Sequence, residues 1–257
     1  MIENFGEGAI KLSAMNGVSF ASLDEGLLRL MKRAGFDTIN LSFVSIDSST
    51  KERMRRPKPA AEFDKILEKA EQVGLNVIGY AIMGMPGQTI EEMVDTLIDL
   101  MGRKVLIGPS VYYPTPGTPL FEVCEKEGIL PPDLSRWRSS AFPIETEKFS
   151  RLDLVTLFRL ARCINFIKWK IARKELDEGI TWEELIQMLQ EKAKDEGKDN
   201  EPSWIELLLL LFSERSFFGL KKDSGGVSFV KEGSSKKVLD YFFGKAWKSS
   251  VLRSRST

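Results

Sequence analysis

The sequence predicts an α/β fold in which about four parallel strands alternate with helices, followed by a mainly helical second half. Three observations support this prediction. Apolar, β-branched segments alternate with amphipathic segments, the connections between them are short, and glycine lies near the end of the amphipathic segments. Such alternation favours parallel strands with helices packed outside, either as a barrel or as an open, doubly wound sheet.

The elements of the first half follow from these patterns. Strands are predicted over 10–15, 38–46, 76–83 and 104–113, and helices over 23–36, 60–75, 89–103 and 120–129. In the first helix, apolar residues recur at helical spacing from Leu27 to Ala34, and Gly35 stops the helix. Residues 1–130 are therefore expected to form one α/β domain.

Residues 131–257 are expected to form a second, mainly helical domain with a short hairpin. Helices are predicted over 150–176, 181–197, 204–212 and 236–247, and the hairpin over 217–230, turning at 223–226. Thr181 and Glu184 have the spacing of a capping box at the start of the second helix.

Composition excludes several classes of protein. The 257 residues include 37 Lys plus Arg and 37 Asp plus Glu, so no global charge favours nucleic acid or an anionic membrane. No segment has the apolar length of a membrane helix, and the amino-terminal residues lack the pattern of a signal peptide. We therefore expect a cytoplasmic protein with neither a nucleic-acid nor a membrane partner.

The side chains that most often carry catalysis or bind metals are scarce. The chain has no histidine and two cysteines, Cys124 and Cys163, which lie far apart in the sequence. This excludes zinc sites of the Cys/His type and histidine-based triads. Two thiolates are also too few to hold an iron-sulfur cluster, so no metal ligand is predicted within this chain.

The stretch GYAIMGMPGQT, residues 79–89, predicts a strand, a tight loop and a helix start. Gly84, Pro86 and Gly87 mark the loop, and Thr89 with Glu92 has the spacing of a capping box. Glycines let a ligand approach the backbone closely, so the loop could form the floor of a pocket. The alternative is that they only permit a sharp turn, and both interpretations remain open.

In folds of this kind the ligand sits at the carboxyl ends of the strands. The loops at that position are 13–17, 45–59, 84–89 and 112–119. Most of these loops are rich in Gly, Pro, Ser or Asn, and we expect them to lie together.

Five segments resemble a known family when taken in order: MNGV, LDEGLLRLMKRAGFDTINLSFVSID, RRPKP, GLNVIGYAIMGMPGQTIEEMVDTL and VYYPTPGTPLFEVCEKEG. Together they resemble the second half of a radical S-adenosylmethionine (radical SAM) core domain. The nearest branches are proteins with a cobalamin-binding domain, methylthiotransferases and coproporphyrinogen oxidases. The resemblance implies a partial (β/α)6 TIM-like barrel that contains the third to sixth strands.

The resemblance also implies which residues meet SAM. Ser45, at the end of the fourth barrel strand, matches a polar position near the ribose, and Asn16 matches the turn after the third strand. On the fifth strand, the residues that would border the adenine are Ile82, Gly84, Met85, Pro86 and Gly87. On the sixth strand, the backbone of Val111, Tyr112 and Tyr113 would meet the same base.

Two departures from the family pattern limit what the resemblance implies. Many members have a glutamate just before the serine of the fourth strand, where this chain has Val44. The motif C-x3-C-x2-C, whose cysteines hold a [4Fe-4S] cluster, is absent. The implied cofactors are therefore SAM, a cluster only if its ligands come from elsewhere, and cobalamin as an open third candidate.

The resemblance implies that the chain begins at the third barrel strand, so an unpaired sheet edge has to be covered. We expect a separate polypeptide with the amino-terminal half-barrel, self-association across the open edge, or a gene fragment. Two functions remain open. The chain is either the C-terminal portion of a radical SAM enzyme, inactive alone and acting on an unknown substrate, or a non-catalytic scaffold or interaction module.

Overall fold

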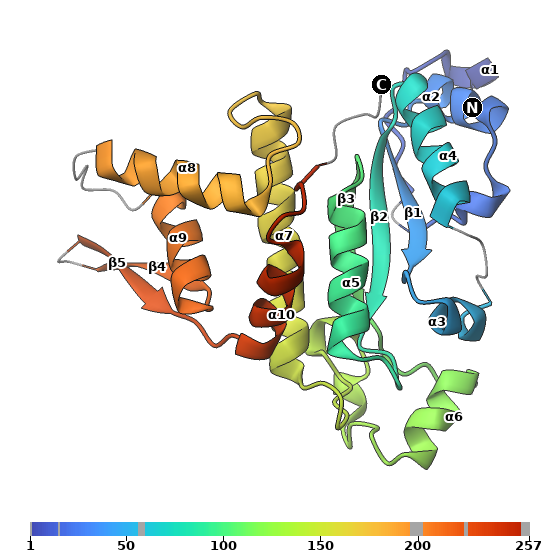
Figure 1. The fold of residues 1–257 in the computed structure, drawn as a ribbon. Coiled ribbons are helices and arrows are strands. Elements are labelled where there is room, and N and C mark those ends of the chain that lie inside the picture. The colour runs from blue at the N-terminus through green and yellow to red at the C-terminus, as the bar shows by residue number, and fades with distance from the viewer. Residues whose placement is uncertain (1, 15, 56–59, 196–202, 224–225, 253–257) are drawn as a thin grey trace.

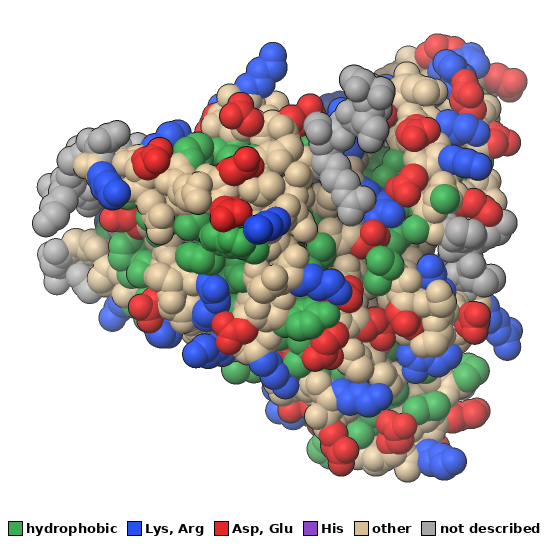
Figure 2. All heavy atoms as spheres, in the orientation of Figure 1, with side chains coloured by type: hydrophobic (Ala, Val, Ile, Leu, Met, Phe, Trp, Pro, Cys, Tyr) green, Lys and Arg blue, Asp and Glu red, His purple; other side chains and the backbone are tan. Residues whose placement is uncertain are grey.

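The computed structural model describes residues 2–14, 16–55, 60–195, 203–223 and 226–252. Figure 1 shows an α/β part on one side of the molecule and a mainly helical part on the other. Acidic and basic side chains are interspersed over the face shown in Figure 2, in keeping with the balanced composition. None of the helices within the described ranges is long and apolar enough to cross a bilayer.

A three-stranded parallel sheet forms the centre of the α/β part. Its strands are β1 (Thr38–Val44), β2 (Asn76–Met83) and β3 (Leu106–Val111), in the order β1-β2-β3. The register pairs Thr38 with Asn76, and Ile78 with Leu106. The carboxyl ends of β1 and β2 point toward the side of the molecule that carries the short helices α3 (Ser48–Arg53) and α6 (Pro119–Lys126) (Figure 1).

The helices predicted for the first half are confirmed. They are α2 (Glu25–Ala34), α4 (Ala60–Gln72), α5 (Ile90–Met101) and α6. Two short helices, α1 (Ile2–Phe5) and α3, were not predicted, since each is too short for periodicity to reveal. The α/β class with parallel strands is thus correct.

The strand predicted over 10–15 does not form among the described residues. Within this segment Leu12 forms a single parallel bridge to Phe36, just before β1, and beyond the segment Val18 forms another to Leu41 of β1. Small and polar residues and the Asn16-Gly17 turn interrupt its apolar pattern, so it cannot extend along β1. The sheet therefore has three strands where the sequence suggested about four.

The second half follows the predicted order of elements. Its helices are α7 (Arg151–Ala172), α8 (Trp182–Asp195), α9 (Trp204–Glu214) and α10 (Lys236–Ala246). The hairpin consists of β4 (Phe218–Asp223) and β5 (Gly226–Lys231), with the predicted turn falling partly outside the described residues. Three single-turn 3-10 helices complete the fold at Phe20–Ser22, Leu134–Arg136 and Ser139–Ala141.

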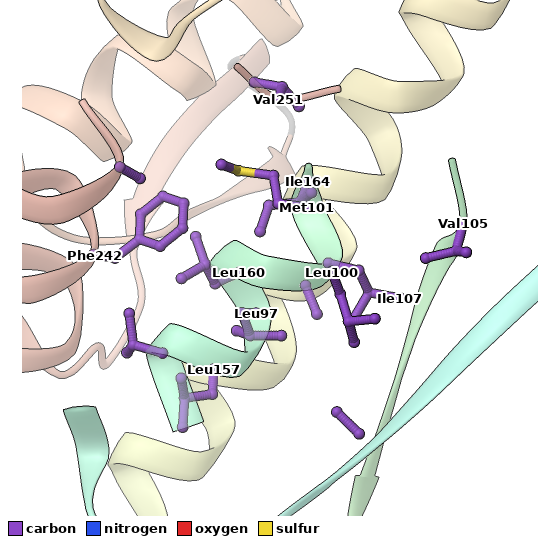
Figure 3. Close-up of a cluster of buried hydrophobic side chains, with 14 of the residues drawn as sticks. Leu97, Leu100, Met101, Val105, Ile107, Leu157, Leu160, Ile164, Phe242 and Val251 are labelled. Carbon is purple, nitrogen blue, oxygen red and sulfur yellow. The ribbon is translucent and has the colours of Figure 1, made fainter. Parts of the chain in front are cut away.

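One hydrophobic core connects the two halves of the chain. Figure 3 shows Leu97 and Leu100 of α5 facing Leu157 and Leu160 of α7, with Phe242 of α10 closing the cluster. Each of these side chains is fully buried. Because α7 packs on both α5 and β3, the helical half is built onto the sheet, whereas the division into two domains at residue 130 stays a prediction.

Two polar side chains of α7 fix the position of that helix against the sheet. Asn165 accepts a hydrogen bond from the backbone N–H of Ile107 and donates one to its carbonyl, both at 2.8 Å. The Lys168 ammonium donates to the carbonyls of Leu100, Arg103 and Val105 at 2.7–2.9 Å. Asn165 thus satisfies backbone groups on the outer edge of β3, and Lys168 caps the end of α5.

Candidate functional site

The loop after β1 begins with a strained turn. Between Ser42 and Val44 the register with β2 shifts by a bulge, and Val44 has φ 71°. The N–H of Ser45 donates to the carbonyl of Phe43 at 3.1 Å, which closes a three-residue γ-turn around Val44. A positive φ at a β-branched residue costs about 1–3 kcal/mol, so surrounding contacts have to hold this turn.

Ser45 makes those contacts. Its side chain is completely buried, its hydroxyl donates to Oε1 of Glu92 at 2.9 Å, and it accepts from the N–H of Asp47 at 3.0 Å. Thr96 Oγ1 lies 3.3 Å from the same hydroxyl. Ser45 therefore faces α5, and its predicted contact with the SAM ribose stays a prediction that requires this side chain to turn.

The loop after β2 needs both of its glycines for structural reasons. Gly84 and Gly87 have φ of 80° and 83°, a region that favours glycine. A Cβ at Gly84 would lie 2.8 Å from Leu154 Cδ1, and one at Gly87 would lie 2.7 Å from Arg53 Nη1. These contacts support the interpretation of a sharp turn, while the role of the loop as a pocket floor stays a prediction.

Gln88, which the sequence analysis did not single out, holds the inside of this loop. Its side chain is 1% exposed. Its Oε1 accepts from the N–H of Met85 at 2.9 Å, and its Nε2 donates to the carbonyl of Ile82 at 3.2 Å. Nε2 also donates to Glu92 Oε1 at 3.0 Å. One side chain thus links the end of β2, the loop and the first turn of α5.

The capping box predicted at Thr89 and Glu92 forms only in part. Thr89 Oγ1 accepts from the N–H of Glu92 at 3.2 Å, as a cap should. The Glu92 carboxylate, however, binds Ser45 and Gln88. The box predicted at Thr181 and Glu184 is complete, because Glu184 Oε2 accepts from the N–H of Thr181 at 2.9 Å and Thr181 Oγ1 accepts from the N–H of Glu184 at 3.2 Å.

Cationic side chains from two other segments hold the outside of the loop. Arg53 of α3 donates from Nη1 to the carbonyl of Pro86 at 2.9 Å, and Lys148 donates to the carbonyl of Gly87 at 3.2 Å. Arg53 can approach the loop because Gly87 has no side chain. The position of α3 therefore depends on the glycine at this place in the loop. The loop is thereby fixed from three directions.

The remaining predicted site residues differ widely in exposure. Val111 is buried, Tyr113 is 48% exposed, and Asn16 is exposed. The N–H of Tyr112 donates to the carbonyl of Met83 at 2.8 Å, and its hydroxyl lies 3.9 Å from Cys124 Sγ. Burial, with Cys124 beside it, raises the pKa of Tyr112, so this phenol stays protonated. The ends of β2 and β3 therefore lie side by side, as predicted.

A large groove lies at the opposite end of the sheet. It encloses about 1420 Å³ and is lined by the first residues of all three parallel strands, Thr38, Asn76 and Leu106. Ligands of parallel α/β folds bind at the carboxyl ends of strands. The size of this groove is thus no reason to move the candidate site from the strand ends.

Comparison with known proteins finds a family model that matches most of the α/β part. Residues 14–100 match the family model of the Radical SAM superfamily. This part of the chain, about a third of its length, is thus similar to a radical SAM domain. This radical SAM segment, residues 14–100, contains β1, β2 and the loops after both strands.

Three known proteins are similar to this chain. Cytidylyl-2-hydroxyethylphosphonate methyltransferase from Streptomyces wedmorensis is 26% identical over 143 residues, which cover 52% of this chain and 27% of that protein. The radical SAM methyltransferase TsrM from Kitasatospora setae, solved with cobalamin and a [4Fe-4S] cluster, is 19% identical at a TM-score of 0.42, over 51% of this chain and 26% of TsrM. Coproporphyrinogen III oxidase (HemN) from Escherichia coli is 15% identical at a TM-score of 0.43. The match covers 86% of this chain and 41% of HemN.

The chain spans about a quarter of the length of the curated relative that it matches. Radical SAM enzymes use SAM and a [4Fe-4S] cluster. The residues present here do not fit the cluster. The two cysteines of this chain, the free thiols Cys124 of α6 and Cys163 of α7, are too few to supply the three thiolates that the family's motif gives to the cluster.

Among the described residues, no group of three or more His, Cys, Asp or Glu side chains is placed to hold a metal ion.

Proposed function

We propose that this chain contributes the SAM-binding strand ends of a radical SAM enzyme. The observation that carries the proposal is the family match over residues 14–100, which includes the loops that follow β1 and β2. The loops that the sequence analysis assigned to SAM thus lie within or just beyond the matched segment. In such an enzyme, reductive cleavage of SAM supplies a 5′-deoxyadenosyl radical, and this chain would bind and orient the adenosyl part.

We propose methyl transfer as the reaction class. The support is the likeness to the Streptomyces wedmorensis protein, which is named a methyltransferase. Cobalamin, which the sequence resemblance implied, is a candidate third cofactor. The cytoplasmic location expected from the sequence stays a prediction.

We propose that the cluster ligands come from outside residues 1–257, on a polypeptide that joins the sheet next to residues 11–18. The other edge, at β3, is occupied by α7 through Asn165. Along 11–18, by contrast, every described residue is exposed or half-buried. A strand added there would continue the parallel sheet, and a second copy of this chain is the alternative occupant.

A non-catalytic scaffold is the second candidate function. It is favoured by two observations, the lack of a cluster-binding motif in this chain and the burial of Ser45 against Glu92. In a scaffold, the geometry of these loops would serve only the stability of the fold.

Reconstitution separates the two functions. The chain is purified alone and together with a polypeptide that bears a C-x3-C-x2-C motif, loaded with iron and sulfide, and given SAM and a reductant. Our proposal predicts 5′-deoxyadenosine from the complex and none from the chain alone. A stable complex that holds a cluster and yields no 5′-deoxyadenosine would instead favour the scaffold.

A further inference from the structure

The two loops of the candidate site meet at one atom. Oε1 of Glu92 accepts from the Ser45 hydroxyl at 2.9 Å and from Gln88 Nε2 at 3.0 Å. Ser45 belongs to the loop after β1, and Gln88 belongs to the loop after β2. A carboxylate oxygen has lone pairs for both donors, and its negative charge strengthens both hydrogen bonds.

The carboxylate of Glu92 is not needed to cap its own helix. Thr89 already supplies the side-chain cap of α5. Asp95 and Asp99, the next acidic residues of α5, form ion pairs with Lys245 and Arg103. Glu92 therefore binds the two loops in place of the usual return contact of a capping box.

Each loop depends on its contact with Glu92 for a different reason. In the loop after β1, Ser45 directly follows the strained Val44 and accepts from the N–H of Asp47. In the loop after β2, Gln88 is held by Glu92 on one side and itself holds the N–H of Met85 on the other. A loss of the shared carboxylate removes a support from both loops at once.

We propose that Glu92 is a positioning residue that couples the two strand-end loops and holds them in the geometry of the adenosyl site. The second part rests on the proposed function, and the coupling itself does not. Glu92 acts through Ser45 and Gln88, and it need not touch SAM.

Hydrogen exchange of the full chain tests the coupling without any ligand. Gln88→Leu is expected to speed exchange at the N–H of Asp47, which lies in the other loop, by about tenfold, the value of one hydrogen bond. In a Glu92→Leu background, where the link is already lost, Gln88→Leu should add nothing at Asp47. An unchanged Asp47 amide in the Gln88→Leu single variant overturns the proposal.

The reverse measurement protects the test against a variant that fails to fold. Ser45→Ala should speed exchange at the N–H of Met85, because a coupling between two sites acts equally in both directions. Glu91→Gln, at the exposed neighbour of Glu92 on α5, is the matched control and should change neither amide. Acceleration at Met85 by Ser45→Ala supports the coupling, and no change there contradicts it.

SAM binding to the assembled protein then tests the positioning role. Glu92→Leu removes the acceptor shared by Ser45 and Gln88 and is expected to weaken SAM binding about tenfold, while the matched control Glu91→Leu binds as the wild type does. Equal binding by both variants overturns the positioning role. If the wild type itself binds no SAM, the proposed function fails, and the exchange experiment still decides the coupling.

Discussion

Single residues decide how closely the loop after β2 can approach its neighbours. Gly87 has no side chain where the guanidinium of Arg53 lies, and its φ of 83° adds a second reason for glycine. Gly117 has nearly the same φ, 78°, but a Cβ there would meet nothing within 4 Å. Substitutions at Gly87 and Gly117 should therefore cause similar backbone strain, and only the one at Gly87 should also disturb the contact with Arg53.

Gly87→Ala is expected to destabilise the protein by about 2–3 kcal/mol, and Gly117→Ala by about 1 kcal/mol. Urea unfolding of both variants measures the difference. Equal losses would mean that Arg53 moves away freely and that its bond to Pro86 contributes little.

A second prediction at this scale concerns Lys168, which is 6% exposed. Burial, together with the nearby Arg103, lowers the pKa of Lys168 to about 7. Between this value and the ordinary pKa of 10.5, the unfolded chain binds more protons than the folded one, so the free energy of unfolding should rise with pH. Lys168→Met should abolish this contribution and, by leaving three carbonyls unpaired, cost about 2–4 kcal/mol.

Urea unfolding at several pH values from 6.5 to about 9 checks this prediction, in a range below the ordinary titration of tyrosine. The informative quantity is the difference between wild type and variant, since other groups titrate in both. A difference that does not change with pH would show that Lys168 keeps its proton throughout.

At the scale of elements, α7 protects the outer edge of β3 through a single amide. Asn165→Leu removes both hydrogen bonds to Ile107 and is expected to cost about 1–3 kcal/mol and to promote aggregation through the exposed edge. Hydrogen exchange at the N–H of Ile107 and light scattering measure the two effects. Arg162→Leu, at an exposed position of the same helix, should change neither.

The same scale shows which elements the sequence could predict. Helices α2, α4 and α5 were predictable because their apolar residues repeat with the helical period. The capping box at Thr181 was predictable because its partner, Glu184, is only three residues away. The segment 10–15 was wrongly predicted as a strand, since a short apolar run does not reveal how much of a neighbouring strand it meets.

The candidate site was less predictable for a similar reason. The sequence predicted Glu92 as the partner of Thr89 in a capping box, but its carboxylate binds Ser45, which lies 47 residues away. The turn at Val44 is equally invisible to patterns, because its strain depends on contacts with α5. The placement of the glycine loop at the end of β2 was predictable, and the interactions that hold it were not.

At the scale of the whole molecule, the core shared by α5, α7 and α10 predicts cooperative unfolding of both halves. All five tryptophans lie beyond residue 130, so their fluorescence reports on the helical half, while hydrogen exchange of β1, β2 and β3 reports on the sheet. Leu160→Ala should cost about 2–5 kcal/mol and lower both transitions together. Two separate transitions would show that the halves are independent domains.

In the whole molecule, we propose that the carboxyl ends of the strands bind the adenosyl group. Hydrogen exchange of the assembled protein with and without SAM tests this claim directly, since each strand has one end at the candidate site and the other at the large groove. We predict protection of backbone amides at Ile82, Gly84 and Tyr113. Protection at Thr38, Asn76 and Leu106 instead, or none at either end, would contradict the account.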